Sequence, residues 1–543
     1  MARTAGVGLV LAVSLALGAS GASAAPHLPK PRASASKNGP LLRTTFSTRI
    51  HGRSLQRGFR PGRLPRSFVG FGFEYQFLFQ HLGRPDRPDA GPNLVFYRLM
   101  QGLTRLGSGP PGIRLGGGSS DGSWWDPERL PKPRGIFVSL QPWMVGALRA
   151  YYEATRSPLV LGLNLGLRRP AYATEWAKAA MAALPRGAAR AFEIGNEPDI
   201  YPARFLYRDS SGRDHFTRGR HYGFRQWLPE FGGFLRVLRR LRPRPPLAGP
   251  TACCYLSFER GLRRMLRRYG RRLKLVTYHR YALDGCLIER QTPPGSRAYR
   301  RARIKWIRVL LNRDAIGSRA REYGILAATA RHWHLNLRMT ETAPVACKQP
   351  PGIGDSNASA MWAVDWLFSL WFNRVAGANF FSAGGPSAPF GISFVGRRRF
   401  LMGVRPLFYG VRLFAEASAR RARLVLAPVF LSKVRRGARL SIWPTLQHNG
   451  TGRMVVLNKG NRRGGDVSIK VRRAARGATV AFLRMPSLYS TTGIRWAGQT
   501  YGRPTDGDLV GTRIVRRLHK RHGRYRFFLP RASAALVTIP HAG

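Results

Sequence analysis

Three glutamates that follow short β-type runs are the residues of this sequence best suited to acid–base chemistry. The chain has only 12 glutamates, and Glu74, Glu197 and Glu341 each follow an apolar run typical of a strand. A carboxylate costs much less on the surface than at the rim of a packed core, so these positions indicate a function. Hydrolysis of a glycosidic bond needs two such groups, one protonated acid and one anionic nucleophile. The alternative for either glutamate alone is an ion pair with one of the many arginines.

The sequence around two of these glutamates predicts how they are held. Glu197 lies in the segment FEIGNEPD, residues 192–199, in which a strand runs directly into a turn. Pro198 ends the strand and fixes the turn, which keeps the glutamate side chain at the rim. Glu341 lies in the segment LRMTET, residues 337–342, again a strand followed at once by a loop. Two carboxylates placed in this way would face each other across one end of a parallel sheet.

The elements that must position them alternate between strand-like and helix-like segments. Such alternation predicts parallel strands joined by helical crossovers, and eight units over about 330 residues fit a (β/α)8 barrel. Helices are expected over residues 126–149, 173–184, 224–241 and 358–376. The strand-like runs are 68–73, 112–115, 159–165, 191–194, 247–250, 273–278, 335–340 and 378–382.

The pattern changes after about residue 405, where short alternating runs are separated by Gly, Asn and Arg turns. This predicts an all-β domain, a sandwich, over residues 405–543, after a catalytic barrel over residues 66–404. Residues 25–65 are rich in Pro, Ser and Arg and are interpreted as a linker. The alternating run 41–50 within it predicts one strand that joins the β-domain.

The N-terminus has the features of an export signal. A short basic start is followed by the apolar stretch 7–17 and by Ala22-Ser23-Ala24, a small-x-small cleavage site. We interpret residues 1–24 as a secretory signal peptide and expect a secreted protein, extracellular or periplasmic. A lipoprotein or an uncleaved anchor is the alternative, but no cysteine lies at the cleavage site. No other apolar run reaches the length of about 20 residues that a membrane-spanning helix needs.

The charge of the chain is strongly positive. It has 91 Lys and Arg against 26 Asp and Glu, a formal net charge of +65. This favours a polyanionic partner such as an acidic polysaccharide, a nucleic acid or a membrane surface. The alternative is a compositional preference for arginine, because the basic residues run through every segment. No nucleic-acid-binding module is present, so specific nucleic-acid binding is not expected.

Several motifs together resemble glycoside hydrolase family 79, the heparanase and β-glucuronidase family. Asn196-Glu197 and Glu341 alone resemble the larger clan of retaining glycosidases on (β/α)8 barrels. The segment RLGG, residues 114–117, with Asp121 is similar to the strand-2 motif of the family, and Glu74 matches its strand-1 acidic position, which contacts the sugar. The segment VTYHRY, residues 276–281, resembles its strand-6 segment. WAGQ at 496–499 and ASAALV at 532–537 are similar to its β-domain.

The resemblance implies a role for each residue of the site. Asn196 would hold the sugar 2-hydroxyl, Glu197 would be the acid/base and Glu341 the nucleophile. Tyr281 would donate to Glu341, and His279 would help to position it. The alternative for His279 is a histidine satisfied within the core.

The chain departs from the family pattern at two places. The family often has two histidines before the strand-6 tyrosine, whereas Arg280 stands at the second position here. The loop 346–354, which reads ACKQPPGIG, matches loosely the region that contacts the uronate carboxylate in the family. Backbone N–H groups at Gly352 and Gly354 and the charge of Lys348 would serve that carboxylate. The alternative is that this loop is only a connection, closed by a disulfide at Cys347.

Cysteines and tryptophans complete the candidate residues. Cys253, Cys254, Cys286 and Cys347 follow predicted strands, and their spacing is not a zinc signature, so we expect neither a metal nor a cofactor. One or two loop disulfides are expected, with Cys286 and Cys347 as one option and the connectivity left open. Trp124 and Trp125 fit either a core or a platform for a sugar face.

These observations predict a secreted retaining glycoside hydrolase. The leading expectation is a β-glucuronidase that acts on uronic-acid-containing glycans or glucuronides by double displacement. One alternative is the same fold acting on a neutral β-glycoside, namely a xyloside, glucoside or arabinoside. Another is a non-catalytic protein that binds acidic glycans with its basic surface.

Overall fold

The computed structural model describes residues 45–48, 62–84, 91–382, 384–395, 399–425, 429–432, 440–470 and 477–540. The predicted signal peptide, and the predicted linker apart from residues 45–48 and 62–65, lie outside these ranges.

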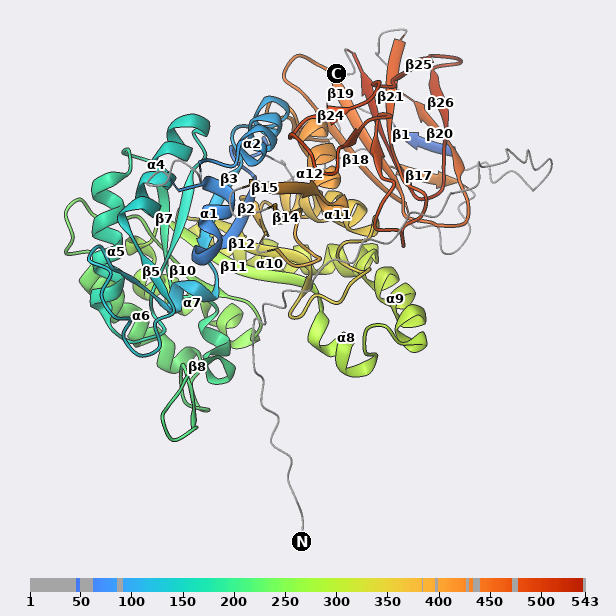
Figure 1. Ribbon diagram of the computed structural model, residues 1–543. Helices are drawn as coiled ribbons and strands as arrows, with labels where there is room; N and C mark the ends of the chain where they lie inside the picture. The colour runs from blue at the N-terminus through green and yellow to red at the C-terminus, as the bar shows by residue number, and fades with distance from the viewer. Residues whose placement is uncertain are drawn as a thin grey trace.

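Eight parallel strands close into a barrel, which confirms the predicted (β/α)8 fold (Figure 1). Each predicted run coincides with one barrel strand, and the strands follow one another around the barrel in chain order. Their apolar sequences are nearly continuous because both faces of a parallel sheet are covered; all five residues of Leu159–Leu163 are buried. The strands are β2 (Val69–Glu74), β3 (Gly112–Gly116), β6 (Leu159–Leu163), β7 (Ala189–Ile194), β10 (Leu247–Ala252), β11 (Leu275–Asp284), β12 (Asn336–Ala346) and β13 (Ala378–Phe381).

Helices surround the barrel, and one of the four predicted helical segments differs from the structure. The segment 126–149 is helical only from Pro142. Pro131, Pro133 and Gly135 interrupt the part before Pro142, which contains the short strand β5 (Val138–Leu140). The principal helices are α2 (Leu94–Leu106), α4 (Pro142–Thr155), α5 (Pro170–Ala183), α6 (Phe224–Leu238), α7 (Leu256–Tyr269), α9 (Arg297–Leu310), α10 (Arg313–His332), α11 (Ala358–Phe372) and α12 (Pro406–Ala417).

Antiparallel sheets form the C-terminal region, consistent with the predicted β-sandwich. Strand β19 (Gly452–Asn458) is buried on both faces, and its successive side chains enter two different cores. Val455 and Leu457 belong to the large core shared with the barrel, whereas Met454 and Val456 belong to a separate core inside the β-domain. The main sheet contains β16 (Arg423–Leu424), β18 (Leu440–Leu446), β19, β27 (Ser533–Ile539), β21 (Gly477–Arg484), β22 (Arg495–Trp496) and β25 (Arg516–His519), and a second sheet pairs β20 (Gly465–Lys470) with β26 (Arg524–Leu529).

A strand from the N-terminal segment lies among these C-terminal strands. Strand β1 (Thr45–Thr48) pairs antiparallel with β17 (Val429–Ser432), with Thr45 opposite Ser432. In Figure 1 the blue β1 lies within the orange and red region of the β-domain. The segment ahead of the barrel therefore reaches the β-domain.

A buried polar cluster joins the barrel to the β-domain. Asp365 on α11 accepts hydrogen bonds from Ser441 Oγ at 2.9 Å and from Trp443 Nε1 at 2.8 Å, both on β18. It also forms an ion pair with Lys459 Nζ at 2.5 Å, and both side chains are almost fully buried. A buried charge of this kind is tolerated because it is paired and hydrogen-bonded.

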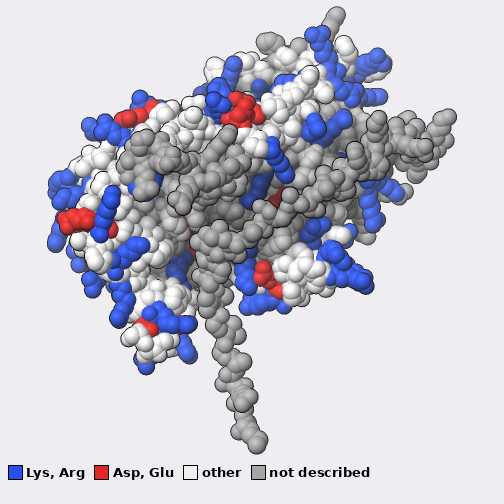
Figure 2. All heavy atoms as spheres, viewed as in Figure 1, with Lys and Arg blue, Asp and Glu red and all other residues white. Residues whose placement is uncertain are grey.

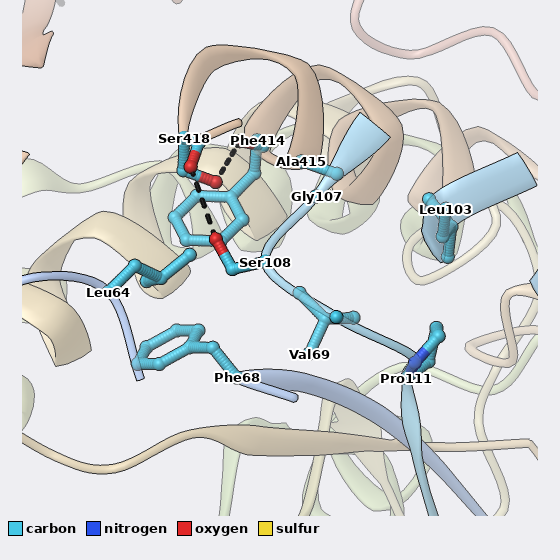
Figure 3. A pocket seen from close by; sticks show the side chains of 11 residues that line it. Leu64, Phe68, Val69, Leu103, Gly107, Ser108, Pro111, Phe414, Ala415 and Ser418 are labelled. Carbon is cyan, nitrogen blue, oxygen red and sulfur yellow. Dashed lines mark hydrogen bonds between the residues drawn. The ribbon is translucent and has the colours of Figure 1, made fainter. Parts of the chain in front are cut away.

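A small, mainly apolar pocket lies at the opposite end of the barrel from the glutamates (Figure 3). Its wall includes Val69, the first residue of β2, and Pro111, which precedes β3. The α12 end of its wall is tied to the barrel by a hydrogen bond of 3.3 Å from Ser108 Oγ to the carbonyl of Ser418. This pocket is part of the packing between barrel and α12.

Basic side chains are distributed over the visible face of the protein. In Figure 2 the Lys and Arg side chains are spread over barrel and β-domain alike, with few acidic groups between them. Within the described ranges, no helix combines the length and the apolar character needed to cross a membrane.

Candidate active site

The predicted site residues meet at the carboxyl ends of the barrel strands. Glu74 is the last residue of β2, and Asn196 and Glu197 follow β7. His279 and Tyr281 are the fifth and seventh residues of β11, and Glu341 lies in the middle of β12, directly opposite His279. The expectation that a loop follows Glu341 at once is wrong, because β12 continues to Ala346. The carboxyl ends of parallel barrel strands face the same mouth, which is where side chains from several strands converge.

Glu197 and Glu341 face each other at short range. One carboxylate oxygen of each and a ring nitrogen of His279 all lie within 4.8 Å of one another. Glu341 is 6% exposed, whereas Glu197 is partly open to solvent. The structure therefore brings together two carboxyl groups from strands on opposite sides of the barrel, one of which is accessible to a ligand.

Two donors hold the carboxylate of Glu341. The hydroxyl of Tyr281 donates to Oε1 at 2.5 Å, and Nη1 of Arg114 donates to Oε2 at 2.5 Å. Burial and the negative charge of Glu341 raise the pKa of Tyr281 well above its ordinary value. Tyr281 therefore stays protonated and remains a donor over the whole working pH range. Hydrogen bonds to a charged acceptor are the stronger class, so the orientation of this carboxylate is well fixed.

Arg114 on β3 contacts four residues of the site, one of which is His279, whose Nε2 lies 3.4 Å from Nη2 of Arg114. Besides Glu341, it donates through Nε to Glu193 Oε2 at 2.8 Å and through Nη2 to Asn196 Oδ1 at 2.8 Å. Glu193 is fully buried; burial would raise its pKa, but the charges of Arg114 and His279 lower it below the ordinary value. Because Arg114 uses the amide oxygen of Asn196, the amide N–H2 group is the part left to meet a ligand oxygen.

Glu197 occupies a special backbone position. Its φ of 51° lies in the left-handed region, which is uncommon outside glycine and is often found at functional sites. Its N–H donates to the carbonyl of Thr251 at 2.9 Å, which fixes it against the end of β10. Pro198 follows and begins the short 3-10 helix η3 (Pro198–Ala203). The predicted turn is thus present, and it presents the carboxylate at the mouth.

Two basic side chains contact the carboxylate of Glu197. His279 Nδ1 lies 3.1 Å from Oε1, and Arg204 Nη2 donates to Oε2 at 3.2 Å. Burial would raise the pKa of Glu197, but the hydrogen bond and charge of His279, with the charges of Arg204 and Arg114, lower it below its ordinary value. The same ring nitrogen of His279 is 3.9 Å from Glu341, so the closer partner of this fully buried histidine is Glu197.

Glu74 is engaged by the backbone of the next barrel loop. It accepts from the N–H groups of Gly118 at 3.1 Å and Ser119 at 2.7 Å, at the start of the short helix α3 (Gly118–Asp121). Burial raises the pKa of Glu74, and the charge of Glu341 adds to the rise. Glu74 therefore lies within the electrostatic reach of the nucleophile candidate.

Asp121 is the main site residue whose role sequence analysis did not assign. Its carboxylate accepts from the backbone N–H groups of Gly166 at 3.0 Å and Asn196 at 3.2 Å, and from the hydroxyl of Tyr201 at 2.8 Å. Arg204 Nη1 also donates to it, at 3.2 Å. It joins the loops that follow β3, β6 and β7 and so fixes the turn of Glu197. The sequence signal that could have identified Asp121 as a site residue was its place in the same motif as residues 114–117.

Glu193 and Arg204 were not singled out from the sequence. Glu193 lies four residues before Glu197 inside a predicted strand, where the alternation of side chains places it toward the barrel interior. That pattern could have identified it as the partner of a buried arginine. Arg204 is one of many arginines in loops, and no sequence signal distinguished it.

The loop expected to bind a uronate carboxylate is largely engaged in protein contacts. Lys348 Nζ forms an ion pair with Glu289 at 2.9 Å. The N–H of Gly352 donates to Asp355 Oδ1 at 2.6 Å, and Gly354 packs closely on Ser387. Within the described part of the chain, no recorded contact joins these three residues to the two glutamates.

Both disulfides lie at the carboxyl ends of barrel strands. Cys286 and Cys347 are bonded, which is the pairing considered as one option from the sequence, and this ties the loop after β12 to helix α8 (Gly285–Gln291). Cys253 and Cys254 form a disulfide between adjacent residues at the end of β10. The sequence did not predict that bond.

The two adjacent tryptophans combine features of both expected roles. Trp125 stacks on Trp176 with ring centroids 5.7 Å apart, and Trp124 meets the edge of Tyr172 at 6.1 Å. Both are only partly buried. They line the loop after β3 without belonging fully to the core.

The donor set at the mouth is unsuited to a metal ion. Glu197, His279 and Glu341 lie close enough to share an ion. Both carboxylates, however, already accept hydrogen bonds from guanidinium groups, those of Arg204 and Arg114. A divalent cation would have to displace these fixed positive charges or lie against them. The arrangement fits acid–base and nucleophilic chemistry by the side chains themselves.

Comparisons with known proteins find likenesses to glycoside hydrolases. No protein-family model matches the chain. It is 23% identical over 326 residues to the β-glucuronidase of Aspergillus niger, a match that covers 55% of this chain and 55% of that enzyme. The chain thus spans about half the length of this curated relative.

Solved structures share the whole architecture. A 4-O-α-L-rhamnosyl-β-D-glucuronidase from Fusarium oxysporum has a TM-score of 0.68 and 15% identity, and the match covers 91% of this chain and 100% of that one. A family 51 arabinofuranosidase from Xanthomonas axonopodis pv. citri has a TM-score of 0.62 and 14% identity, over 92% of this chain and 99% of that one. At these identities the likeness is one of fold: the chain has the barrel-plus-β-domain architecture found in glycoside hydrolases.

Proposed function

We propose that the protein is a retaining glycoside hydrolase in which Glu341 is the nucleophile and Glu197 the acid/base. One observation carries the proposal. The two carboxylates approach each other within 4.8 Å at the mouth of the barrel, and each is held by its own donors. Retaining glycosidases place their carboxyl groups about 5–5.5 Å apart, whereas inversion needs roughly 6.5–9.5 Å to admit a water. The 4.8 Å limit refers to one oxygen of each carboxylate, and this close approach is compatible with the shorter separation that double displacement uses.

In the first step, a carboxylate oxygen of Glu341 forms a bond to the anomeric carbon while the bond to the leaving-group oxygen breaks. Glu197 gives its proton to that oxygen, which departs as a hydroxyl group. Tyr281 and Arg114 orient the attacking carboxylate through hydrogen bonds to its two oxygens. The N–H2 group of Asn196 is available to the sugar 2-hydroxyl, because Arg114 occupies its oxygen.

In the second step, Glu197 acts as a base. It takes a proton from a water molecule whose oxygen bonds to the anomeric carbon, and Glu341 leaves as a carboxylate. Esterification of Glu341 has removed one negative charge from the site, which lowers the tendency of Glu197 to hold a proton. His279 and Arg204 stabilise the ionised form of Glu197 at this stage.

We further propose that the substrate is a β-glucuronide and that the chain is a member of family 79. The match to the Aspergillus niger β-glucuronidase and the motif resemblance support this assignment. The net charge of +65 would attract a polyanionic glycan, an effect that weakens with salt. We also propose that residues 1–24 direct export of the protein, and this proposal rests on the signal-like sequence alone.

A neutral β-glycoside is the second candidate substrate, and one observation favours it. Lys348 and the N–H of Gly352, two of the groups expected to receive a uronate carboxylate, are bound to Glu289 and Asp355. A neutral sugar needs no such receptor.

Turnover of matched aryl glycosides tests both levels of the proposal. We expect kcat/KM for the aryl β-glucuronide to exceed that for the β-glucoside and β-xyloside. Equal or better turnover of a neutral sugar would reject the uronidase assignment and leave the glycosidase assignment intact. Glu341→Gln should abolish turnover of every substrate, whereas Glu153→Gln, a surface control in an exposed i,i+4 ion pair, should not. No hydrolysis of any glycoside by the folded protein would reject the glycosidase assignment.

A further inference from the structure

An apolar surface is exposed on the segment that is hydrogen-bonded to the turn of the proposed acid/base. Cys254, Tyr255 and Leu256 follow β10, and Tyr255 and Leu256 are each 58% exposed. Within the part of the chain that the structure describes, the ring of Tyr255 makes no aromatic or cation–π contact, so its face is available. Single exposed apolar residues need no explanation, but three in a row next to a reactive carboxylate do.

This surface is fixed to the turn of Glu197 by an unusual arrangement. Asp199, two residues after Glu197, accepts the N–H groups of Cys253 at 3.1 Å, Cys254 at 2.7 Å and Tyr255 at 2.9 Å. The disulfide between Cys253 and Cys254 restricts the same backbone. From the other side, Glu197 N–H donates to the carbonyl of Thr251. The surface formed by Cys254, Tyr255 and Leu256 and the acid/base Glu197 therefore belong to one hydrogen-bonded unit.

A second pair of exposed apolar side chains lies on the segment that follows Glu197 in the chain. Phe205 and Phe216 face each other across the hairpin of β8 (Phe205–Arg208) and β9 (Asp214–Phe216), and each is 43% exposed. The hairpin starts directly after Arg204, which contacts Glu197. Exposed apolar side chains thus lie on both chain segments that are hydrogen-bonded to Glu197 and its turn.

The chemistry of the proposed reaction indicates which part of the substrate would contact these residues. An acid/base must lie within hydrogen-bond reach of the glycosidic oxygen, so the leaving group lies beside it. We propose that Cys254, Tyr255 and Leu256 form the subsite for the leaving group, and that this subsite selects an aglycone that presents an apolar ring face. Aromatic rings and the apolar faces of sugars both stack on such a surface. This inference rests on the proposed glycosidase function and on Glu197 as its acid/base.

The test compares leaving groups that reach the surface formed by Cys254, Tyr255 and Leu256 with one that does not. A naphthyl glycoside and a disaccharide present a ring to the subsite, whereas the leaving group of a glycosyl fluoride is a single atom. For Tyr255→Ala we expect KM for the naphthyl glycoside to rise about five- to tenfold with kcat changed less. The glycosyl fluoride should be hydrolysed at the wild-type kcat/KM. If the disaccharide is affected but the naphthyl glycoside is not, the subsite is specific for a sugar.

Matched variants separate a subsite from a structural role. Tyr255→Phe keeps the ring and should retain the aglycone preference, while Phe528→Ala removes a ring that is 51% exposed on β26 of the β-domain and should leave all substrates unchanged. Equal losses on fluoride and naphthyl substrates would overturn the inference, because they would indicate damage to Glu197. Unchanged kinetics, or a changed oligomeric state alone, would also overturn it. Failure of the proposed function is distinct, since the wild-type protein would then hydrolyse none of these substrates.

Discussion

Removal of the hydroxyl of Tyr281 isolates one hydrogen bond to the proposed nucleophile. Tyr281→Phe keeps the ring and deletes the donor that lies 2.5 Å from Glu341 Oε1, while Arg114 still holds Oε2. A hydrogen bond to a charged group contributes about 1.5–3 kcal/mol, and the loss of that amount from a transition state slows a reaction about 10- to 150-fold.

The loss should fall mainly on the second step. In that step Glu341 leaves the anomeric carbon and regains its charge, which the tyrosine hydroxyl stabilises. In the first step the same carboxylate loses charge, so the hydroxyl helps the transition state less than it helps the free enzyme. With an activated aryl glycoside, we therefore expect kcat and KM to fall together and the glycosyl-enzyme to accumulate.

Rapid-mixing kinetics of aryl-alcohol release provide the measurement. The variant should show a burst close to one equivalent per active site, followed by a slow steady state. A rise in KM at unchanged kcat would show that Tyr281 contributes only to substrate binding. Wild-type kinetics would refute the role given to its short contact with Glu341.

Three further predictions follow from charges in the structure. His279 and Arg204 lower the pKa of Glu197, so the protonated form of Glu197 declines as pH rises. For a substrate with a poor leaving group, kcat/KM should therefore peak in the acidic range, whereas for a substrate with an activated leaving group it should depend less on pH. Glu197→Gln should remove this difference between the substrates, and its activity should respond to added azide. Asp365→Ala leaves Lys459 buried without its partner, which should cost about 3–5 kcal/mol and lower the Tm in calorimetry, whereas Asp365→Leu combined with Lys459→Met should recover much of it. If the positive charge captures an acidic substrate, kcat/KM on an anionic glycan should fall with added salt while that on a neutral aryl glycoside stays constant.

The barrel could be predicted because its strands carry a strong and continuous signal. Runs such as Leu159–Leu163 are apolar at every position and buried at every position. The segment 126–149 was harder, because only its second half has apolar residues at helical spacing. Pro131, Pro133 and Gly135 oppose a helix over the first half, and the helix begins only at Pro142.

The reactive residues were accessible to sequence reasoning because strand ends converge in any barrel, whichever loops surround them. Their supporting partners were not. Arg204 contacts Glu197 only because η3 and the turn after it fold back over the mouth, and the disulfide between Cys253 and Cys254 depends on the backbone path after β10. The loop 346–354 shows the same limit, since the charge of Lys348 pairs with Glu289 on helix α8. Long-range contacts of this kind leave no periodic pattern in the sequence.

Trapping of the covalent intermediate tests the central claim most directly. A 2-deoxy-2-fluoro-β-glycosyl fluoride slows both steps but leaves the first one fast enough to label the nucleophile, and glucuronyl, glucosyl and xylosyl forms cover the candidate sugars. Peptide mass spectrometry after incubation should find one fluorosugar per chain, attached to Glu341 and absent from the Glu341→Gln variant. A label on another residue, or hydrolysis of the unmodified glycoside with inversion at the anomeric carbon and no label at all, would contradict the assignment of Glu341 as the nucleophile of a retaining glycosidase.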